Sequence, residues 1–138
     1  MVSADAFRRV ALSLPEATEA AHFENVSFKV AKKIFATLNV PQNRATVKLS
    51  VANQDIFCTF DDTVIYPVPN KWGNQGWTHV NLLNVQEEML TEVLKTAYCE
   101  VAPKKLAELV IFAWTGTFVV WIRISELKNF QNSKQKII

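Results

Sequence analysis

The chain opens with the pattern of one amphipathic helix. Apolar residues recur at the helical spacing i, i+3, i+4 and i+7 from Phe7 to Leu14, and Ser3 stands ahead of them as an N-cap. Pro15 is expected to end this helix, because the residue before a proline is pushed out of helical geometry. Residues 16–22 are acidic and rich in alanine, and we interpret them as a connection or a short turn.

Three segments then alternate apolar and polar residues with a period of two. They cover residues 26–30, 34–38 and 45–49, and this period is typical of half-buried strands. Residues 31–33 between the first two segments favour a hairpin turn. Residues 41–44, which begin with a proline, supply the next turn. Together these segments predict a three-stranded antiparallel meander.

The region that follows mixes a short helix with two more strands. Ser50 is placed to cap the helix, and residues 63–68 and 77–82 are the predicted strands. The connection between these strands, residues 70–76, holds two of the three glycines in the chain. It is therefore the most turn-prone segment of the sequence.

The clearest helix lies near the end of the pattern. Asn84 and Glu87 have the spacing of a capping box, ahead of a broad apolar stripe over residues 89–101. Pro103 can begin a further helix at its first position. Aromatic and β-branched residues favour a strand over residues 112–124. This order of elements predicts an α+β fold, in which an antiparallel β-sheet has helices packed on one face.

Composition and length limit the class of protein. A chain of 138 residues with 49% hydrophobic and 20% charged residues has room for one packed domain and is unlike a disordered chain. The N-terminus has no apolar stretch behind a basic one, and the run at residues 109–122 is shorter than the ~20 residues of a spanning helix. Cys58 and Cys99 are far apart and are expected to be reduced. We therefore expect a soluble cytoplasmic protein that does not use a membrane as partner.

Residues with catalytic potential are few. His22 lies close to Glu24, which could form an acid/base pair, but no nucleophile motif lies nearby. His79 falls within a predicted strand, where a surface or edge position is the simpler interpretation. Glycine-rich phosphate loops, nucleophile elbows and metal-binding histidine motifs are absent from the sequence. We therefore expect no enzymatic activity, no cofactor and no metal.

The basic residues suggest a different function. Several fall at predicted turns, and two fall in the polar phase of strands, where they can share one face of the sheet. Cationic turns beside an aromatic residue suit contacts with nucleic-acid phosphates and bases. The structural alternative is that lysines favour turns and protect sheet edges from aggregation. The candidate DNA-binding residues are Lys29, Lys32, Lys33, Arg44, Lys48, Lys71 and Trp72.

Several of these segments together resemble the MmcQ/YjbR-like family. The resemblance covers residues 7–110 and is carried by residues 22–30, 33–38, 47–49, 66–69, 76–77 and 90–106. It implies a frataxin (CyaY)-like α+β fold for residues 1–111. It leaves residues 112–138 as an aromatic-rich C-terminal extension of unknown role.

The resemblance also implies a double-wing mode of DNA binding. The first wing would be the hairpin of residues 27–38, and the second would be the strands that flank Lys71, Trp72 and Trp77. The first turn has no glycine where family members often carry one, so we expect a wider tip. Iron binding, which a frataxin-like fold could suggest, is not expected, because the first predicted helix carries Asp5 as its only acid.

Three hypotheses follow from the sequence. The leading one is a non-catalytic protein that binds double-stranded DNA through basic β-hairpin wings. An alternative is a protein-interaction module that forms a homodimer through the C-terminal extension, with no role in nucleic-acid binding. A third is a small-molecule binder with a cleft near Trp72 and Trp77.

Overall fold

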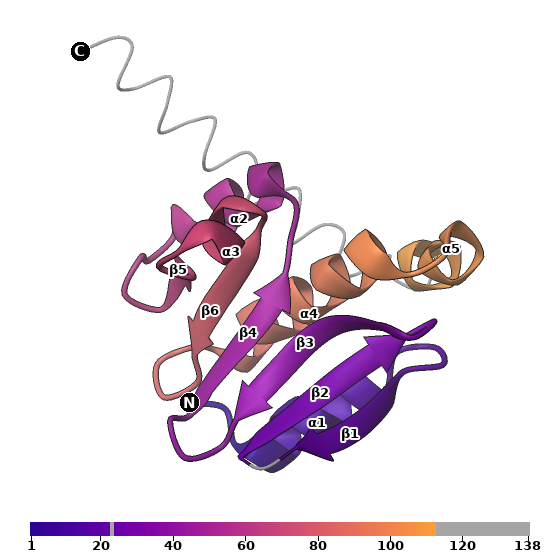
Figure 1. Ribbon diagram of the computed structural model, residues 1–138, viewed down its shortest axis with the longest axis horizontal. Coiled ribbons are helices and arrows are strands. Elements are labelled where there is room, and N and C mark those ends of the chain that lie inside the picture. The colour runs from indigo at the N-terminus through magenta and orange to yellow at the C-terminus, as the bar shows by residue number, and fades with distance from the viewer. Residues whose placement is uncertain (23, 113–138) are drawn as a thin grey trace, which may run out of the picture.

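The computed structural model describes residues 1–22 and 24–112. One six-stranded antiparallel sheet, in the order β1-β2-β3-β4-β6-β5, organises this part of the chain (Figure 1). The predicted α+β fold is confirmed. The helices are α1 (Ala4–Leu12), α2 (Val51–Cys58), α3 (Lys71–Asn74), α4 (Glu87–Val101) and α5 (Lys104–Phe112), and the strands are β1 (Thr18–His22), β2 (Asn25–Val30), β3 (Lys33–Asn39), β4 (Arg44–Lys48), β5 (Ile65–Pro67) and β6 (Trp77–Asn81).

The first helix forms as the sequence predicts. Ser3 is its N-cap, and its Oγ accepts a hydrogen bond from the backbone N–H of Ala6 at 3.1 Å. The buried face of α1 carries Phe7, whose ring centroid lies 5.4 Å from that of Phe28 on β2. This contact seats α1 on the sheet.

The interpretation of residues 16–22 as a connection is wrong, because Thr18–His22 is strand β1. It pairs antiparallel with β2 along its whole length. Its sequence lacks the alternation that marks a strand, so pairing with a neighbour decided the structure over local preference. Glu19 also ties the strand to α1, where its Oε2 accepts a hydrogen bond from Arg8 Nε at 2.9 Å.

The β2–β3 turn is tighter than the sequence suggested. Only Ala31 and Lys32 connect the two strands, with φ angles of 51° and 68°. Two consecutive positive φ angles are the signature of a type I′ hairpin, whose twist matches that of the strands. The expectation of a wider tip is therefore wrong, and the turn adopts this geometry without glycine. The register between β2 and β3 shifts at Phe28/Lys29.

One face of the sheet carries the core. Helices α1 and α4 lie against it, α5 packs on α4, and α2 and α3 lie beside β5 and β6 (Figure 1). Tyr98 of α4 is buried, with its ring edge-on to Phe35 at 5.6 Å between centroids, and its hydroxyl donates to the backbone oxygen of Pro15 at 2.6 Å. The buried hydrophobic residues of the strands on this side are Phe28, Val30, Phe35, Ala36, Leu38, Ala45, Val47, Ile65 and Val80.

The start of α4 differs from the predicted capping box. The helix begins at Glu87 with Gln86 as N-cap and without a side-chain capping bond. Asn84 instead lies in a turn, where its N–H donates to the backbone oxygen of Asn81 at 3.3 Å. Asn84 therefore belongs to the turn that follows β6 and does not cap α4.

Of the predicted C-terminal extension, residues 112–138, the structure describes only the first residue. Phe112, the first residue of the predicted strand 112–124, is the last residue of α5. The rest of that strand and the proposed self-association of the extension lie outside the described residues. Within residues 1–22 and 24–112, no helix combines the length and the apolar character that a membrane span needs.

Candidate nucleic-acid interface

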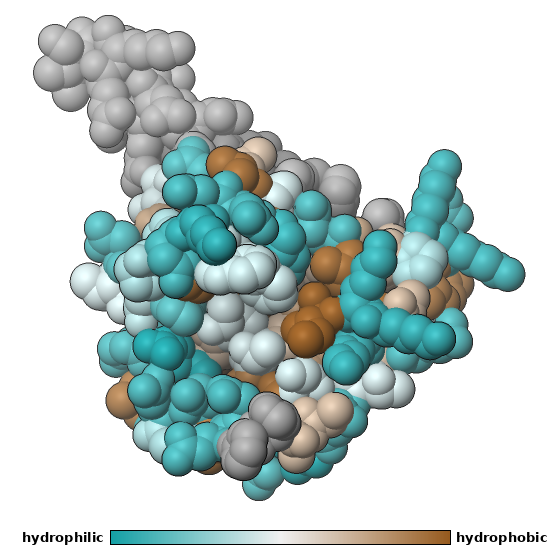
Figure 2. Space-filling view, viewed as in Figure 1, coloured by the Kyte–Doolittle hydropathy of each residue, from teal (hydrophilic) through white to brown (hydrophobic). Residues whose placement is uncertain are grey.

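The second face of the sheet is free of helices α1 and α4 and carries the polar phase of the strands. A row of side chains crosses this open face, because the strand register aligns one residue from each of five strands. Figure 2 views this face and shows a centre of intermediate hydropathy, with hydrophilic residues to its left and a small hydrophobic patch at its right. The aligned row consists of Ser27, Thr37, Thr46, His79 and Tyr66.

His79 is the most constrained member of the row. Its Nδ1 lies 2.8 Å from Thr46 Oγ1, and its ring packs edge-on to Tyr66 at 5.5 Å between centroids. Burial lowers the pKa of His79, and the nearby charge of Arg44 lowers it further. The imidazole is therefore neutral at pH 7. β6 lies between β4 and β5, so His79 is not on an edge strand, and of the two positions expected from the sequence it occupies a half-buried one on the open surface of the sheet.

A hollow of about 320 Å³ opens on this face beside α3. Trp72 of α3 is half exposed, and Trp77 begins β6 on the open face. Aromatic walls with a few hydroxyl and imidazole groups are the usual chemistry of small-ligand sites. The lining residues are Thr37, Thr46, Val68, Trp72, Trp77 and His79.

The buried side-chain amide of Gln54 holds together the corner formed by α3 and the start of β6, which carry Trp72 and Trp77. Gln54 of α2 is 8% exposed, and its Nε2 donates to the backbone oxygens of Gly73 at 2.9 Å and Trp77 at 3.2 Å. It also donates to Thr78 Oγ1 at 3.1 Å. Asn70 caps α3, since its Oδ1 accepts from the N–H of Trp72 at 2.8 Å. One side chain thus ties α2 to both α3 and β6.

Two glycines allow the chain to approach itself at this corner. A Cβ on Gly73 would lie 1.9 Å from the backbone oxygen of Val68. Gly76 has a φ of +103°, and a Cβ there would lie 1.8 Å from the backbone oxygen of Leu49. The Gly76 oxygen in turn accepts from the Leu49 N–H at 3.0 Å. The glycine-rich connection is therefore a close-packed corner that includes α3, where the sequence predicted only a loop.

Four of the predicted DNA-binding residues lie at two connections on the same end of the sheet. Lys32 and Lys33 are exposed at the β2–β3 turn. Lys71 and Trp72 are exposed on α3, in the connection between β5 and β6, and the Lys71 Nζ lies 5.8 Å from the centre of the Trp72 ring. That distance is within the range of a cation–π contact.

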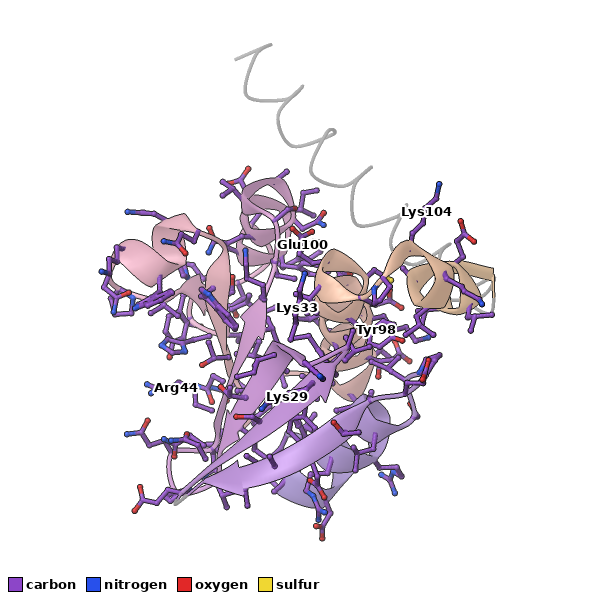
Figure 3. All side chains as sticks on the ribbon, turned by 45° about the vertical axis from the view of Figure 1, so that its right-hand side comes forward. Lys29, Lys33, Arg44, Tyr98, Glu100 and Lys104 are labelled. Atoms are coloured by element: carbon purple, nitrogen blue, oxygen red, sulfur yellow. The ribbon has the colours of Figure 1, made fainter. Side chains whose placement is uncertain are left out.

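The other three predicted residues lie along the open face. Lys29 and Lys48 share this face, as the alternation predicted, and Lys29 pairs with Ile34, the residue next to Lys33 on β3. The Lys48 Nζ donates to the backbone oxygens of Leu49, at 3.1 Å, and of Gln75. Lys48 thus also holds the α3 corner to β4. Arg44 begins β4 at the opposite end of the sheet, away from the two connections (Figure 3).

Charge is segregated between the sheet and the rest of the chain. Residues 25–54 and 63–86 contain no Asp or Glu, and they include strands β2 to β6. Six basic residues fall in the same two ranges. Glu19 on β1 is paired with Arg8 of α1. The open face with its two connections is therefore a cationic surface with an aromatic hollow.

Comparison with known proteins identifies the family. The YjbR family model matches residues 12–100. The chain belongs to the YjbR family. Its structure is similar to the crystal structure of a DUF419-domain protein of Deinococcus radiodurans (DR2400), with 25% sequence identity and a TM-score of 0.65. The alignment covers 80% of this chain and 88% of that one. No curated protein matches the chain.

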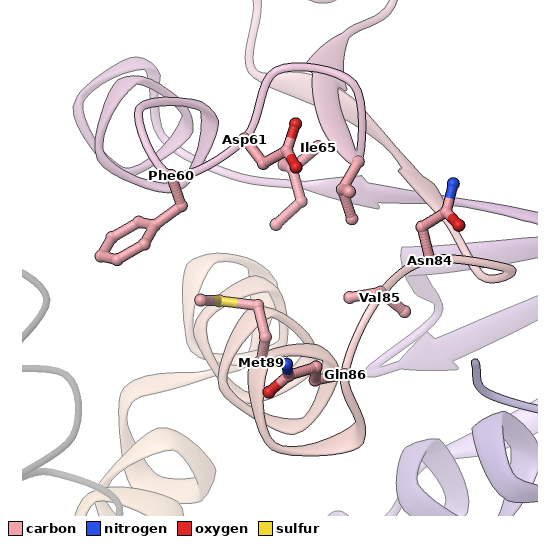
Figure 4. A pocket seen from close by; sticks show the side chains of 8 residues that line it. Phe60, Asp61, Ile65, Asn84, Val85, Gln86 and Met89 are labelled. Atoms are coloured by element: carbon pink, nitrogen blue, oxygen red, sulfur yellow. The ribbon is translucent and has the colours of Figure 1, made fainter.

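A second hollow of this YjbR-family chain lies between the segment that joins α2 to β5 and the start of α4. It has about 300 Å³ and is lined by Phe60, Ile65, Val85 and Met89 together with polar residues of the adjoining turns (Figure 4). Asp61 at its rim accepts hydrogen bonds from the N–H and the hydroxyl of Thr63, and these bonds lower its pKa. The Asp61 carboxylate thus stabilises the turn at residues 61–63.

Other candidates for chemistry are also accounted for. Burial raises the pKa of Cys58 and of Cys99 to about 11, so neither thiol is ionised at neutral pH. Both cysteines are free. Within the described parts of the YjbR-family chain, no cluster of His, Cys, Asp or Glu could hold a metal ion. The side chain of His22, which the sequence paired with Glu24, lies outside the described residues.

Sequence reasoning missed several members of this site. Neither Thr37, Thr46 and Tyr66 of the open face nor Gln54 of α2 was singled out. The polar phase of the strands carried part of the signal, since it places Thr46 and His79 on open faces. The cross-strand alignment was not readable, because β6 inserts between β4 and β5.

Proposed function

We propose that this YjbR-family protein binds DNA without catalysis, through the open face of its sheet and the two connections at one end of it. The observation that supports the proposal most is the separation of charge. Six basic residues and no acidic ones occupy residues 25–54 and 63–86. Such a surface attracts a polyanion, and its affinity comes mainly from the release of counterions.

The two connections fit the double-wing arrangement that the family resemblance implies. The β2–β3 turn offers Lys32 and Lys33 to solvent, and α3 offers Lys71 beside Trp72. Two of the ammonium protons of Lys48 are used by backbone oxygens, so we assign it a smaller part in phosphate contact. If Lys32, Lys33 and Lys71 each contact one phosphate, the slope of log K against log[salt] is roughly −3.

The test is a fluorescence-anisotropy titration of labelled duplex DNA at several salt concentrations. The double variant Lys32→Ala/Lys33→Ala should bind more weakly and flatten the salt slope by roughly 2. A matched control is Lys104→Ala/Lys105→Ala, which removes the same charge from exposed positions on α5, away from the open face (Figure 3). This control should retain the affinity and slope of the natural protein.

Two results would overturn the proposal. One is the absence of binding at low salt, where electrostatic affinity is greatest. The other is equal weakening by the two double variants, which would mean that DNA senses only the total charge of the protein.

A further inference from the structure

We infer that the hollow beside α3 holds one planar heteroaromatic ring of the size of a nucleobase. The inference rests on the proposed function where the ring belongs to a DNA strand, and it identifies the part of the nucleic acid that the protein recognises. The ring could also come from a free nucleotide, which presents the same chemistry. Both sources are separated in the experiment below.

The walls of the hollow suit a flat aromatic ligand. Trp72 is 50% exposed, an unusual position for a large aromatic side chain with a core available, and Trp77 lies on the same face. Bases stack on aromatic side chains whatever their identity, because each base has a π-face. A volume of about 320 Å³ is at the small end of ligand sites and accommodates one ring system rather than a large molecule.

The strands at the base of the hollow, β3, β4 and β6, provide polar groups that can form hydrogen bonds. Thr37 and Thr46 face each other across β3 and β4, and His79 follows Thr46 across β6. The contact of His79 with Thr46 engages Nδ1 and leaves Nε2 as the second polar atom of the ring. Hydroxyl and imidazole groups can both donate and accept, so they can pair with the nitrogen and oxygen atoms at a base edge.

The surroundings suit the phosphate of the same nucleotide. Lys71 lies beside Trp72, with Nζ 5.8 Å from the ring centre. The chain on both sides of this point, residues 63–86, has no acidic residue to repel a phosphate. A base on the indole and a phosphate on the ammonium group would together bind one nucleotide.

The hollow is also built before any ligand arrives. Gln54, Gly73 and Gly76 fix the position of α3 against β4 and β6 through buried hydrogen bonds and close backbone contacts. A site that needs no ordering loses less affinity on binding. The same rigidity prevents the hollow from adapting to a stacked base pair.

The base must therefore be unpaired. In a perfect duplex each base is stacked on both sides, and extracting it from the stack costs free energy. This cost is smallest for a base that is already unpaired or bulged. The protein should therefore prefer a duplex with one bulged adenine to the perfect duplex of the same sequence.

The experiment compares three ligands, and one control ligand without a base, on the full chain. Anisotropy competition measures the perfect duplex and the bulged duplex, and calorimetry measures adenosine monophosphate, with ribose 5-phosphate as the ligand without a base. Trp72→Leu should lower affinity for the bulged duplex by roughly five- to a hundredfold and remove the preference for the bulged duplex over the perfect one. Trp72→Phe should restore most of the loss. Phe60→Leu, which changes an exposed aromatic at the other hollow, should have no effect.

The outcomes separate the two proposals. Equal binding of both duplexes, unchanged in Trp72→Leu, overturns the inference and leaves DNA binding intact. Binding of adenosine monophosphate that Trp72→Leu abolishes, without binding of either duplex, supports the hollow as a site for free nucleotides and overturns the proposed function. Absence of binding of all three ligands overturns both.

Discussion

Replacing Gln54 tests whether one buried amide holds the α3 corner. The variant Gln54→Leu keeps the approximate volume of the side chain but removes the Nε2 group, which reaches Gly73, Trp77 and Thr78. An amide nitrogen has two protons, so its three contacts amount to about two full hydrogen bonds. The perturbation is therefore the loss of two buried bonds with little change in packing.

The structure limits the size of the effect. The Gly73 oxygen also accepts from the Gly76 N–H at 3.0 Å, and the Trp77 oxygen also accepts from the Val68 N–H at 3.0 Å. Because these two carbonyls keep a partner, the penalty for an orphaned buried group does not apply in full. Two net hydrogen bonds then correspond to a loss of about 2 kcal/mol in the free energy of unfolding. Gln54→Glu should cost more, since it directs carboxyl oxygens at these acceptors.

Urea unfolding followed by circular dichroism measures this loss. Gln54→Leu should lower the midpoint without changing the m-value. Gln42→Leu, at an exposed position of the β3–β4 turn, is the control and should change the free energy of unfolding by less than about 0.5 kcal/mol. If Gln54→Leu is as mild as this control, the amide does not hold the corner and the argument for a preformed hollow fails.

Three further predictions concern the fold. Gly76→Ala should lower stability by more than about 2 kcal/mol in the same unfolding assay, because its Cβ would meet the Leu49 oxygen at 1.8 Å in a backbone region that disfavours side chains. Tyr98→Phe should cost about 1 kcal/mol by removing the bond to Pro15, and a loss near zero would contradict this. The pKa of His79 is lower in the folded state than its ordinary 6.5, so the unfolded chain takes up the proton first. The contribution of His79 to stability is complete above pH 6.5 and is lost as the pH falls through the folded pKa. His79→Gln should therefore flatten the change in urea midpoint between neutral and mildly acidic pH.

Local pattern predicted the centre of the fold well and its margins poorly. The period-two segments of β2, β3 and β4 gave the meander, and the caps at Ser3 and Ser50 both accept the expected backbone bonds. These features depend on neighbours in sequence. Strand β1 could not be predicted in this way, because nothing in Thr18–His22 alternates and its pairing with β2 supplies the stability that local preference lacks.

The sequence could assign the candidate site to one face of the sheet, but it could not predict the contacts between its residues. Alternation placed Lys29 and Lys48 on the same side of the sheet, and both lie there. What brings Thr46 between Thr37 and His79 is the order of strands, in which β6 pairs with β4 across about 30 residues of chain. Gln54 shows the same limit, since a glutamine in a short helix has no pattern that reports its partners. Non-local pairing is the information that a single sequence does not display.

The two connections at the end of the sheet differ in construction, and this difference assigns them different contributions to binding. The β2–β3 turn is two residues long and presents exposed ammonium groups at Lys32 and Lys33. Such groups act through counterion release, so their contribution should fall steeply with salt. The β5–β6 connection is a close-packed corner that presents Trp72 as a fixed wall. Stacking on an indole involves little charge, so its contribution should persist at high salt. A protein built this way gains most of its attraction to DNA from the β2–β3 turn, and it gains its preference for an unpaired base from the β5–β6 connection.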